Sequence, residues 1–260
     1  MAYQAFNLEG RTALVTGGNG GIGYGMALAL LQAGAKVSIW GSRAEKTERA
    51  REQLAAACGD AGRVHALSCD VGDEAALQAA FAETVQALGG RLDACFANAG
   101  VSSKGMPLTE MSLQDWQHVQ RINVEGVFMT FREAARHMIE GGHGGSLVAT
   151  ASTAALEGAA RNSAYGASKG AVTSFVRAAA VELARHKIRA NSILPGWIVT
   201  EMTENSIGNE RFAQAVMPRI PARRWGEGDD FGGIAVYLAS DASSYTTGEQ
   251  FVIDGGYTKF

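Results

Sequence analysis

Hydrophobic and polar positions alternate between two patterns along the chain. Short runs rich in Val, Ile, Leu and Ala, most of them continuously apolar, predict strands that are buried on both faces, as in a parallel sheet. Longer stretches with a 3.6-residue period separate these runs and predict helices. The predicted strands are Thr12–Thr16, Lys36–Trp40, Val64–Cys69, Leu92–Ala97, Ser146–Ala151, Arg189–Leu194 and Gln250–Ile253. The predicted helices are Ile22–Ala33, Arg43–Ala57, Asp73–Leu88, Ser112–Glu140, Ser163–His186 and Asp229–Ser240.

This alternation predicts an α/β fold with a doubly wound parallel sheet flanked by helices. Neither an internal repeat nor a linker interrupts the pattern, so we expect residues 1–260 to form a single domain. Residues 197–228 break the rhythm, with two Pro, several polar residues and only a weak helical pattern at Glu210–Met217. An irregular stretch of this length in a compact domain is typical of a binding loop, and we expect a substrate lid here.

Composition excludes several classes of protein. The chain carries 23 Lys and Arg against 26 Asp and Glu, scattered without a basic stripe, which disfavours nucleic acid as a partner. Neither a signal peptide nor a long apolar run is present, so we expect a soluble, cytoplasmic protein that does not enter a membrane. Cys58, Cys69 and Cys95 are widely spaced and form no cluster with the five His residues, which disfavours a disulfide scaffold and a metal site.

Glycines and small polar residues follow most of the predicted strands. The carboxyl ends of parallel strands share one edge, which is where open α/β sheets bind ligands. Gly17–Gly23, in TALVTGGNGGIG, end the first strand and open a helix, as in a turn that brings backbone N–H groups close to a pyrophosphate. The stretch can be read as G-x-G-x-x-G on Gly18, Gly20 and Gly23, or as T-G-x-x-x-G-x-G on Thr16, Gly17, Gly21 and Gly23.

A tyrosine and a lysine are the strongest candidates for chemistry. Tyr165 and Lys169 are four residues apart in a predicted helix, so their side chains project from one face. An ammonium beside a phenol favours the phenolate, and we therefore expect Lys169 to lower the pKa of Tyr165 towards that of a general acid/base. Ser152, at the end of the preceding strand, could donate to an oxygen beside Tyr165. A solvated helix face for the pair and a turn or N-cap role for Ser152 are the alternatives.

These motifs together resemble the short-chain dehydrogenase/reductase family over Leu8 to Tyr257. The resemblance implies a single-domain Rossmann fold with a seven-stranded sheet, and an NAD(P)-dependent oxidoreductase that transfers a hydride between nicotinamide and a carbonyl or secondary alcohol. It also implies a homotetramer. The matching elements, in the family's order, are Thr16–Gly23, Asp70 with Val71, Asn98–Gly100, Asn123, Ser152, Tyr165 with Lys169, and Pro195–Thr200.

The resemblance also implies roles for individual residues. Tyr165 would supply or remove the proton of the substrate oxygen, Ser152 would hold that oxygen, and Lys169 would bind the nicotinamide ribose. Asn123 would position a water in a proton relay; its alternative is a solvated helical Asn, but an Asn three residues before Gly126 predicts a local kink. The expected cofactor-binding residues are Gly17, Asn19, Gly21, Ile22, Gly23, Ser42, Arg43, Asp70 and Val71 (adenine), Asn98 (strand register), Ala99, Gly100, Tyr165, Lys169, Pro195, Gly196, and Ile198 with Thr200 (carboxamide).

The end of the second predicted strand bears on cofactor choice. Sites that prefer NAD place Asp or Glu there to hold the ribose 2′-hydroxyl, but this chain has Gly41. Ser42 and Arg43 offer a hydroxyl and a guanidinium, which suit a phosphate, so NADP(H) is favoured. NAD(H) stays an alternative, because Gly20 stands where many NADP-dependent relatives carry a basic residue and Arg43 could be a solvated first-turn residue.

The substrate is less defined than the reaction. A 3-oxoacyl thioester reductase is an alternative, but relatives that act on acyl-carrier thioesters carry Arg where this chain has Met129 and Val181. A non-catalytic dinucleotide sensor would not need Ser152, Tyr165 and Lys169 together, and a zinc alcohol dehydrogenase would need clustered ligands. Apolar residues favour a moderately apolar carbonyl or secondary alcohol, with ordinary packing as the alternative; they are Met106, Trp197, Met202, Ile207, Phe212 and Met217.

Overall fold

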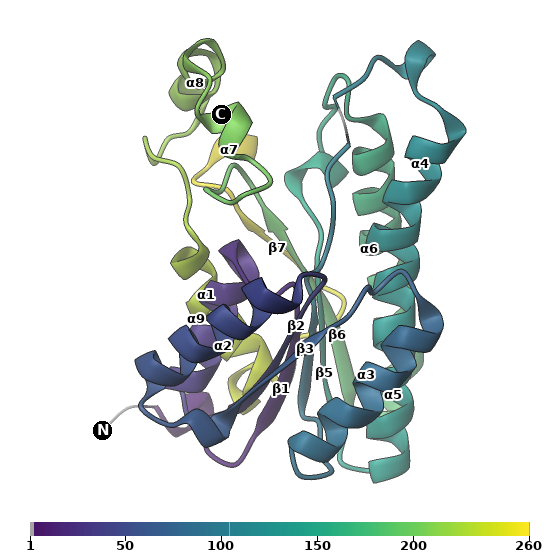
Figure 1. Cartoon of the computed structure of the whole chain (residues 1–260), viewed down its shortest axis with the longest axis vertical. Coiled ribbons are helices and arrows are strands. Elements are labelled where there is room, and N and C mark those ends of the chain that lie inside the picture. Colours follow the sequence, from purple (N-terminus) through teal and green to yellow (C-terminus); the bar gives the residue numbers. More distant parts are fainter. Residues whose placement is uncertain (1–2, 104, 260) are drawn as a thin grey trace.

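The computed structural model describes residues 3–103 and 105–259 and is built on a seven-stranded sheet (Figure 1). The strand order is β3-β2-β1-β4-β5-β6-β7, and every neighbouring pair is parallel. The order reverses between β1 and β4, which is where such sheets bind ligands at their carboxyl edge. The strands are β1 (Thr12–Thr16), β2 (Lys36–Gly41), β3 (Val64–Ser68), β4 (Ala94–Ala97), β5 (Gly145–Thr150), β6 (Ile188–Pro195) and β7 (Gln250–Ile253).

Helices cover both faces of the sheet, which explains the continuous apolar strands. In β1, Leu14 packs into one apolar cluster while Ala13 and Val15 pack into the other, and all three are at most 1% exposed. One face carries α1 (Gly21–Gln32), α2 (Ala44–Cys58) and α9 (Gly232–Ala239), and the other carries α3 (Glu74–Ala87), α5 (Gly126–Gly141) and α6 (Ser163–Leu183) (Figure 1). The remaining helices, α4 (Leu113–Gln120), α7 (Glu204–Ile207) and α8 (Glu210–Val216), lie near the top of Figure 1.

The predicted helix Ser112–Glu140 is divided in the structure. After α4, Arg121–Glu125 form one π-helical turn before α5 begins at Gly126. Asn123 lies in this turn and is fully buried, so the irregularity expected at Asn123 is present and its alternative as a solvated residue is wrong. A Cβ at Gly126 would lie 2.9 Å from a methyl carbon of Val71, so glycine lets α5 approach the end of β3 closely.

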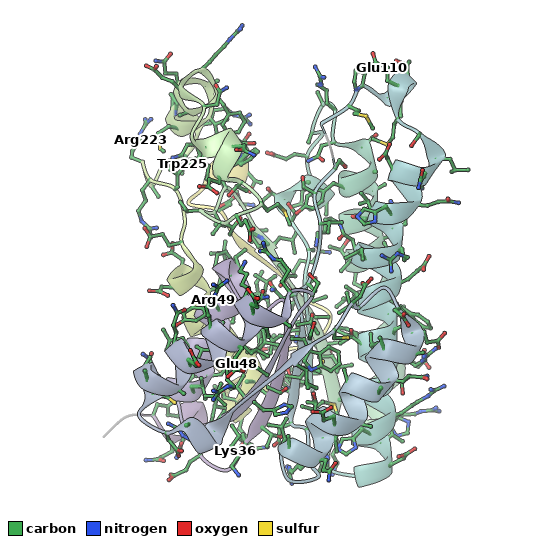
Figure 2. The ribbon with its side chains drawn as sticks, in the orientation of Figure 1. Lys36, Glu48, Arg49, Glu110, Arg223 and Trp225 are labelled. Atoms are coloured by element: carbon green, nitrogen blue, oxygen red, sulfur yellow. The ribbon has the colours of Figure 1, made fainter. Side chains whose placement is uncertain are left out.

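Residues 197–228 follow β6 and carry their own small apolar cluster. Trp197 and Phe212 meet edge to face with ring centroids 4.7 Å apart, and Val216, Ile220 and Tyr257 pack against them. Figure 2 shows Trp225 and Arg223 on the part of this segment that runs from α7 and α8 towards α9, far from Glu110 near α4. Of the apolar residues expected to favour an apolar substrate, only Met202 lines the cleft described below. Ordinary packing accounts for three others, Trp197, Phe212 and Met217.

No helix in the described part of the chain combines the length and apolar character needed to cross a membrane.

Candidate active site

A cleft of about 350 Å³ lies at the carboxyl edge of the sheet. Every expected catalytic or cofactor-binding residue lines it except Gly23 and Asn123. Sequence reasoning missed several other lining residues, because they come together only in the folded chain. These are Trp40, Lys46, Cys69, Val101, Ile122, Thr150, Ala151, Glu201 and Thr203.

The glycine turn between β1 and α1 forms one wall of the cleft. Gly17 and Gly21 have φ of 64° and 52°, a backbone region that other residues rarely adopt. A Cβ at Gly23 would collide with the carbonyl oxygen of Gly17, which explains why this glycine supports the turn without lining the cleft. The first N–H groups of α1 have no partner within the helix and face the position of an anion in dinucleotide sites. The turn therefore fits the pyrophosphate of a dinucleotide.

Asn98 fixes the strand ends around this turn. Its Nδ2 donates to the carbonyl oxygens of Thr16 (3.1 Å) and Gly17 (3.3 Å), and its Oδ1 accepts from the Thr150 hydroxyl at 3.0 Å. The Thr16 hydroxyl accepts in return from the backbone N–H groups of Asn98 and Ala99, both at 3.0 Å. One amide therefore ties β1, β4 and β5 together where the cleft begins.

Ser152, Tyr165 and Lys169 line the same cleft. Ser152 forms a side-chain hydrogen bond with Tyr165, and its hydroxyl also accepts from the Ala154 N–H at 3.1 Å. The turn or N-cap reading of Ser152 is therefore correct, and its hydrogen bond to a substrate oxygen stays a prediction. Lys169 is 3% exposed and donates to the Thr150 carbonyl at 2.8 Å, with its Nζ 5.5 Å from the centre of the Tyr165 ring.

The pKa expected for Tyr165 needs correction. Burial raises its pKa above the ordinary value, and the hydrogen bond with Ser152 offsets only part of that rise. Burial also lowers the pKa of Lys169 to about 8. The Lys169 ammonium lies against the ring of Tyr165 and bonds to a backbone carbonyl, so the structure does not show the lowering expected from the spacing of the two residues.

Asn123 does not line the cleft but contacts Val101, which does. Its Oδ1 accepts from the Val101 N–H at 2.8 Å, and its Nδ2 donates to the Val101 carbonyl at 2.9 Å and to the Ser168 hydroxyl at 3.0 Å. A Cβ at Gly100 would lie 3.1 Å from this Oδ1 and 3.5 Å from the Lys169 Nζ. Asn123 thus holds the chain after β4 against α6, one residue from Lys169.

Two further pairs of expected residues line the cleft near opposite ends of the sheet. Asp70, after β3, accepts from the Gly72 N–H at 2.9 Å and pairs with Arg121 at 3.2 Å, beside the buried Val71. Ile198 and Thr200, after β6, belong to a compact turn in which the Thr203 hydroxyl accepts from the Thr200 N–H at 3.1 Å.

The end of β2 carries two cations and a carboxylate. Arg43 Nη2 lies 2.7 and 2.6 Å from the two carboxylate oxygens of Glu201, and Lys46 Nζ lies 2.6 Å from one of them. Arg43 therefore forms an ion pair as well as contacting solvent, whereas the alternative interpretation had it in solvent alone. A Cβ at Gly20 would lie 3.1 Å from Lys46 Nζ, so Lys46 supplies positive charge beside the glycine loop where Gly20 has none. The three-residue spacing of Arg43 and Lys46 was the available sequence signal.

Gly41 occupies a crowded position. A Cβ there would collide with the Asn19 amide and the Thr47 hydroxyl, which hydrogen-bond to each other at 2.9 Å. A carboxylate at position 41 would have to displace Asn19 from the cleft wall. The end of β2 therefore carries two cations and, at position 41, no carboxylate, a set of groups that fits a phosphate.

No group of three or more His, Cys, Asp or Glu side chains within residues 3–103 and 105–259 could hold a metal ion.

Comparisons with known proteins agree with this geometry. A family model described as enoyl-(acyl carrier protein) reductase matches residues 17–258. The chain is 38% identical over 261 residues to a 2-dehydro-3-deoxy-D-gluconate 5-dehydrogenase of Escherichia coli (strain K12), covering 99% of each chain. It is 38% identical over 253 residues to a D-threitol dehydrogenase of Mycolicibacterium smegmatis, covering 97% of this chain and 95% of the relative. The structure of a gluconate 5-dehydrogenase from Burkholderia cenocepacia J2315, in complex with NADP and tartrate, matches with a TM-score of 0.90 and 33% identity over 100% of both chains.

One cleft holds a glycine turn that fits a dinucleotide together with the side chains of Ser152, Tyr165 and Lys169. This combination is typical of a Rossmann-fold oxidoreductase. The chain belongs to the short-chain dehydrogenase/reductase family. It is an NAD(P)-dependent oxidoreductase that transfers a hydride between the nicotinamide cofactor and a CH–OH or C=O group of a small molecule.

Proposed function

We propose that the enzyme prefers NADP(H) and interconverts a secondary alcohol and a ketone in a small polyhydroxylated substrate, a polyol or a sugar acid. The observation that carries the cofactor preference is the convergence of Arg43 and Lys46 at the end of β2, where position 41 has no carboxylate. The printed activities of the relatives, a gluconate derivative and threitol, support the substrate class. The Burkholderia structure contains NADP, which supports the cofactor.

The chain's own residues divide the chemistry in the following way. The bound nicotinamide supplies or accepts the hydride. Tyr165 gives the phenol proton to the substrate oxygen during reduction and takes it back during oxidation. Ser152 donates a hydrogen bond to the same oxygen, and Lys169, anchored on the Thr150 carbonyl, binds the nicotinamide ribose. Asn123 is a positioning residue that holds the chain after β4, and its part in a water relay stays a prediction.

The glycine turn and the residues after β3, β4 and β6 hold the rest of the cofactor. Gly17, Asn19, Gly21, Ile22 and Gly23 form the pyrophosphate cradle. The residues after β2, Ser42 and Arg43, receive the 2′-phosphate together with Lys46. The other proposed cofactor contacts are Asp70, Val71, Asn98, Ala99, Gly100, Pro195, Gly196, Ile198 and Thr200.

Residues 197–228 form the proposed substrate lid. Their apolar residues pack mainly on one another, which leaves few of them to receive an acyl chain. A 3-oxoacyl thioester is the second candidate substrate, because the matching family model is described as an acyl carrier protein reductase. Met129 and Val181 are uncharged, so neither position offers a cation to an acidic carrier.

A substrate screen tests this proposal. Polyols and sugar acids, their keto forms, steroids and 3-oxoacyl thioesters are each assayed with NADPH or NADP⁺ and with NADH or NAD⁺. We expect the highest kcat/KM with a polyol, a sugar acid or a keto form of one, and with the phosphorylated cofactor. A higher kcat/KM with a 3-oxoacyl thioester would overturn the substrate class.

We further propose that the enzyme works in the cytoplasm as a homotetramer. Phe128 and Ile139 of α5 and Val181 of α6 are 44%, 38% and 83% exposed, and exposed apolar side chains on two neighbouring helices suit an interface between copies. Sedimentation velocity at micromolar concentration tests this, and a monomer would contradict it.

A further inference from the structure

Glu201 occupies the charge site that the proposed cofactor needs. Its carboxylate bonds Arg43 through both oxygens and Lys46 through one. Lys46 lies beside the glycine loop at Gly20, and all four residues line the same cleft. The 2′-phosphate of NADP(H) is expected on these two cations, because the ribose of a bound dinucleotide lies at the end of β2.

A carboxylate and a phosphate compete for such a pair of cations. The phosphate carries a charge of about −1.5 to −2, so it repels a carboxylate held within a few ångströms. Hydrogen bonds from Lys46 and then Arg43 lower the pKa of Glu201 to about 2, so the carboxylate stays charged at every ordinary assay pH. The pairs are solvent-exposed, with Arg43 58% and Glu201 60% exposed, and pairs of this kind are weak enough to exchange.

Glu201 is also held in place by the segment that carries it. The compact turn Ile198–Thr203 is closed by the Thr203 hydroxyl, which contacts Ile198, Thr200 and the Thr200 backbone. The Thr200 methyl would lie 2.8 Å from a Cβ at Gly21, so this turn rests on the glycine loop. Glu201 thereby joins the start of the proposed lid to the end of β2.

We propose that Glu201 is a cofactor-specificity residue that acts as an internal competitor of the 2′-phosphate. It holds Arg43 and Lys46 while the site is free or binds NAD(H), and it yields them only to a phosphorylated ribose. Its carboxylate therefore weakens NADP(H) binding and leaves NAD(H) binding unchanged. The inference rests on the proposed function, since it takes these cations as the phosphate site.

Calorimetric titration of the full chain tests the competition without turnover. The probes are adenosine 2′,5′-bisphosphate and adenosine 5′-monophosphate, which differ only in the 2′-phosphate. We expect Glu201→Gln to bind the bisphosphate about three- to tenfold more tightly, the range that exposed ion pairs support, and the monophosphate as the wild type does. Glu204→Gln is the matched control, because Glu204 lies in the same segment but is not paired with Arg43 or Lys46.

The outcomes separate this inference from the proposed function. If the wild type prefers the bisphosphate and Glu201→Gln binds it no more tightly, the competition is overturned while the NADP(H) preference stands. If only Glu201→Gln prefers the bisphosphate, the competition is supported and the wild-type NADP(H) preference is wrong. If neither protein distinguishes the two probes, both ideas fail.

Discussion

The two edges of the sheet differ in how far their charged side chains are buried and in how these side chains are paired. At the amino edge, Asp93 is 4% exposed and accepts from the Thr12 N–H at 3.0 Å and from Arg91 Nε at 2.7 Å, with Arg11 at 3.4 Å. At the carboxyl edge, the carboxylate of Glu201 is exposed and shared between two exposed or half-exposed cations. The buried charge has fixed partners within the chain, as a stabilising group requires, whereas the exposed charges can exchange theirs for a ligand.

Lys169, at the carboxyl edge, also differs from Asp93 in how its buried charge is paired. It is as buried as Asp93, but its polar partner is the carbonyl oxygen of Thr150 rather than an ion of opposite charge. Burial consequently lowers its pKa to about 8, while the hydrogen bonds around Asp93 keep that carboxyl ionised. The fold thus places a poorly compensated buried charge at the edge that carries the chemistry, where a cofactor can supply the missing hydrogen-bond acceptors.

The largest expected effect is at the carboxyl edge. Replacing Tyr165 with Phe removes the proton donor, so kcat should fall by roughly 10²–10⁴ while NADPH affinity changes little. Tyr245→Phe is the control, because Tyr245 is fully exposed and does not line the cleft. Steady-state kinetics and NADPH titration measure the two quantities, and substantial activity in Tyr165→Phe would refute the proposed mechanism.

A substitution at the amino edge of the sheet should lower the stability of the fold rather than the catalytic rate. Asp93→Ala leaves the Thr12 N–H and Arg91 without their acceptor, so the free energy of unfolding should fall by about 2–4 kcal/mol with the cleft unchanged. Asp241→Ala is the matched control: Asp241 pairs with the same Arg11 but is 74% exposed, and about 1 kcal/mol or less is expected. Urea denaturation compares the variants, and equal losses would contradict the contrast between the edges.

The contribution of Asp93 should depend on pH. Burial alone would raise its pKa, but the hydrogen bonds from Arg91 and Thr12 outweigh burial and lower it. The stabilisation is therefore complete above the ordinary carboxyl pKa of about 4 and disappears as the pH falls through the lowered value. The stability difference between wild type and Asp93→Ala should shrink in acid, and a difference that grows there would contradict this assignment.

Activity should change with pH in the neutral and alkaline range. Tyr165, whose pKa burial raises, is protonated at neutral pH and ready to reduce a ketone. Alcohol oxidation requires the phenolate, whose fraction rises up to about tenfold per pH unit, so oxidation should accelerate from pH 6 to about pH 8. Reduction should stay level until Lys169 loses its charge near its pKa of about 8. Profiles of kcat/KM in both directions test this, and oxidation that slows between pH 6 and 8 would contradict it.

The sequence predicted most of the fold because its signals are local. Continuous apolar runs predicted all seven strands; the largest shift is two residues, at the start of β4 from Leu92 to Ala94, and the other bounds agree within one residue. The residue pattern around Asn123 and Gly126 predicted an irregularity, but it did not predict that the irregularity is a π-helical turn. The glycines likewise predicted the tight turn between β1 and α1, because such a turn depends on local backbone geometry.

The remainder of the site depends on contacts between distant parts of the chain. Glu201 meets Arg43 across 158 positions of sequence, so no local pattern could reveal that pair. The pKa of Tyr165 was predicted wrongly for a related reason: spacing placed Lys169 nearby, but it could not show that both groups are buried or that Lys169 bonds to Thr150. Similarly, the apolar residues after β6 gave no sign that they pack on one another.

The most direct test of exchangeable charge at the carboxyl edge is the ratio of kcat/KM for NADPH to that for NADH. We compare wild type, the double variant Arg43→Ala with Lys46→Ala, and Arg49→Ala, a control on the same helix α2 that is labelled in Figure 2 and does not line the cleft. The account predicts that the wild type and Arg49→Ala favour NADPH, and that the double variant lowers the ratio at least about tenfold with little change for NADH. A wild type that favours NADH, or a ratio that the double variant leaves unchanged, would contradict it.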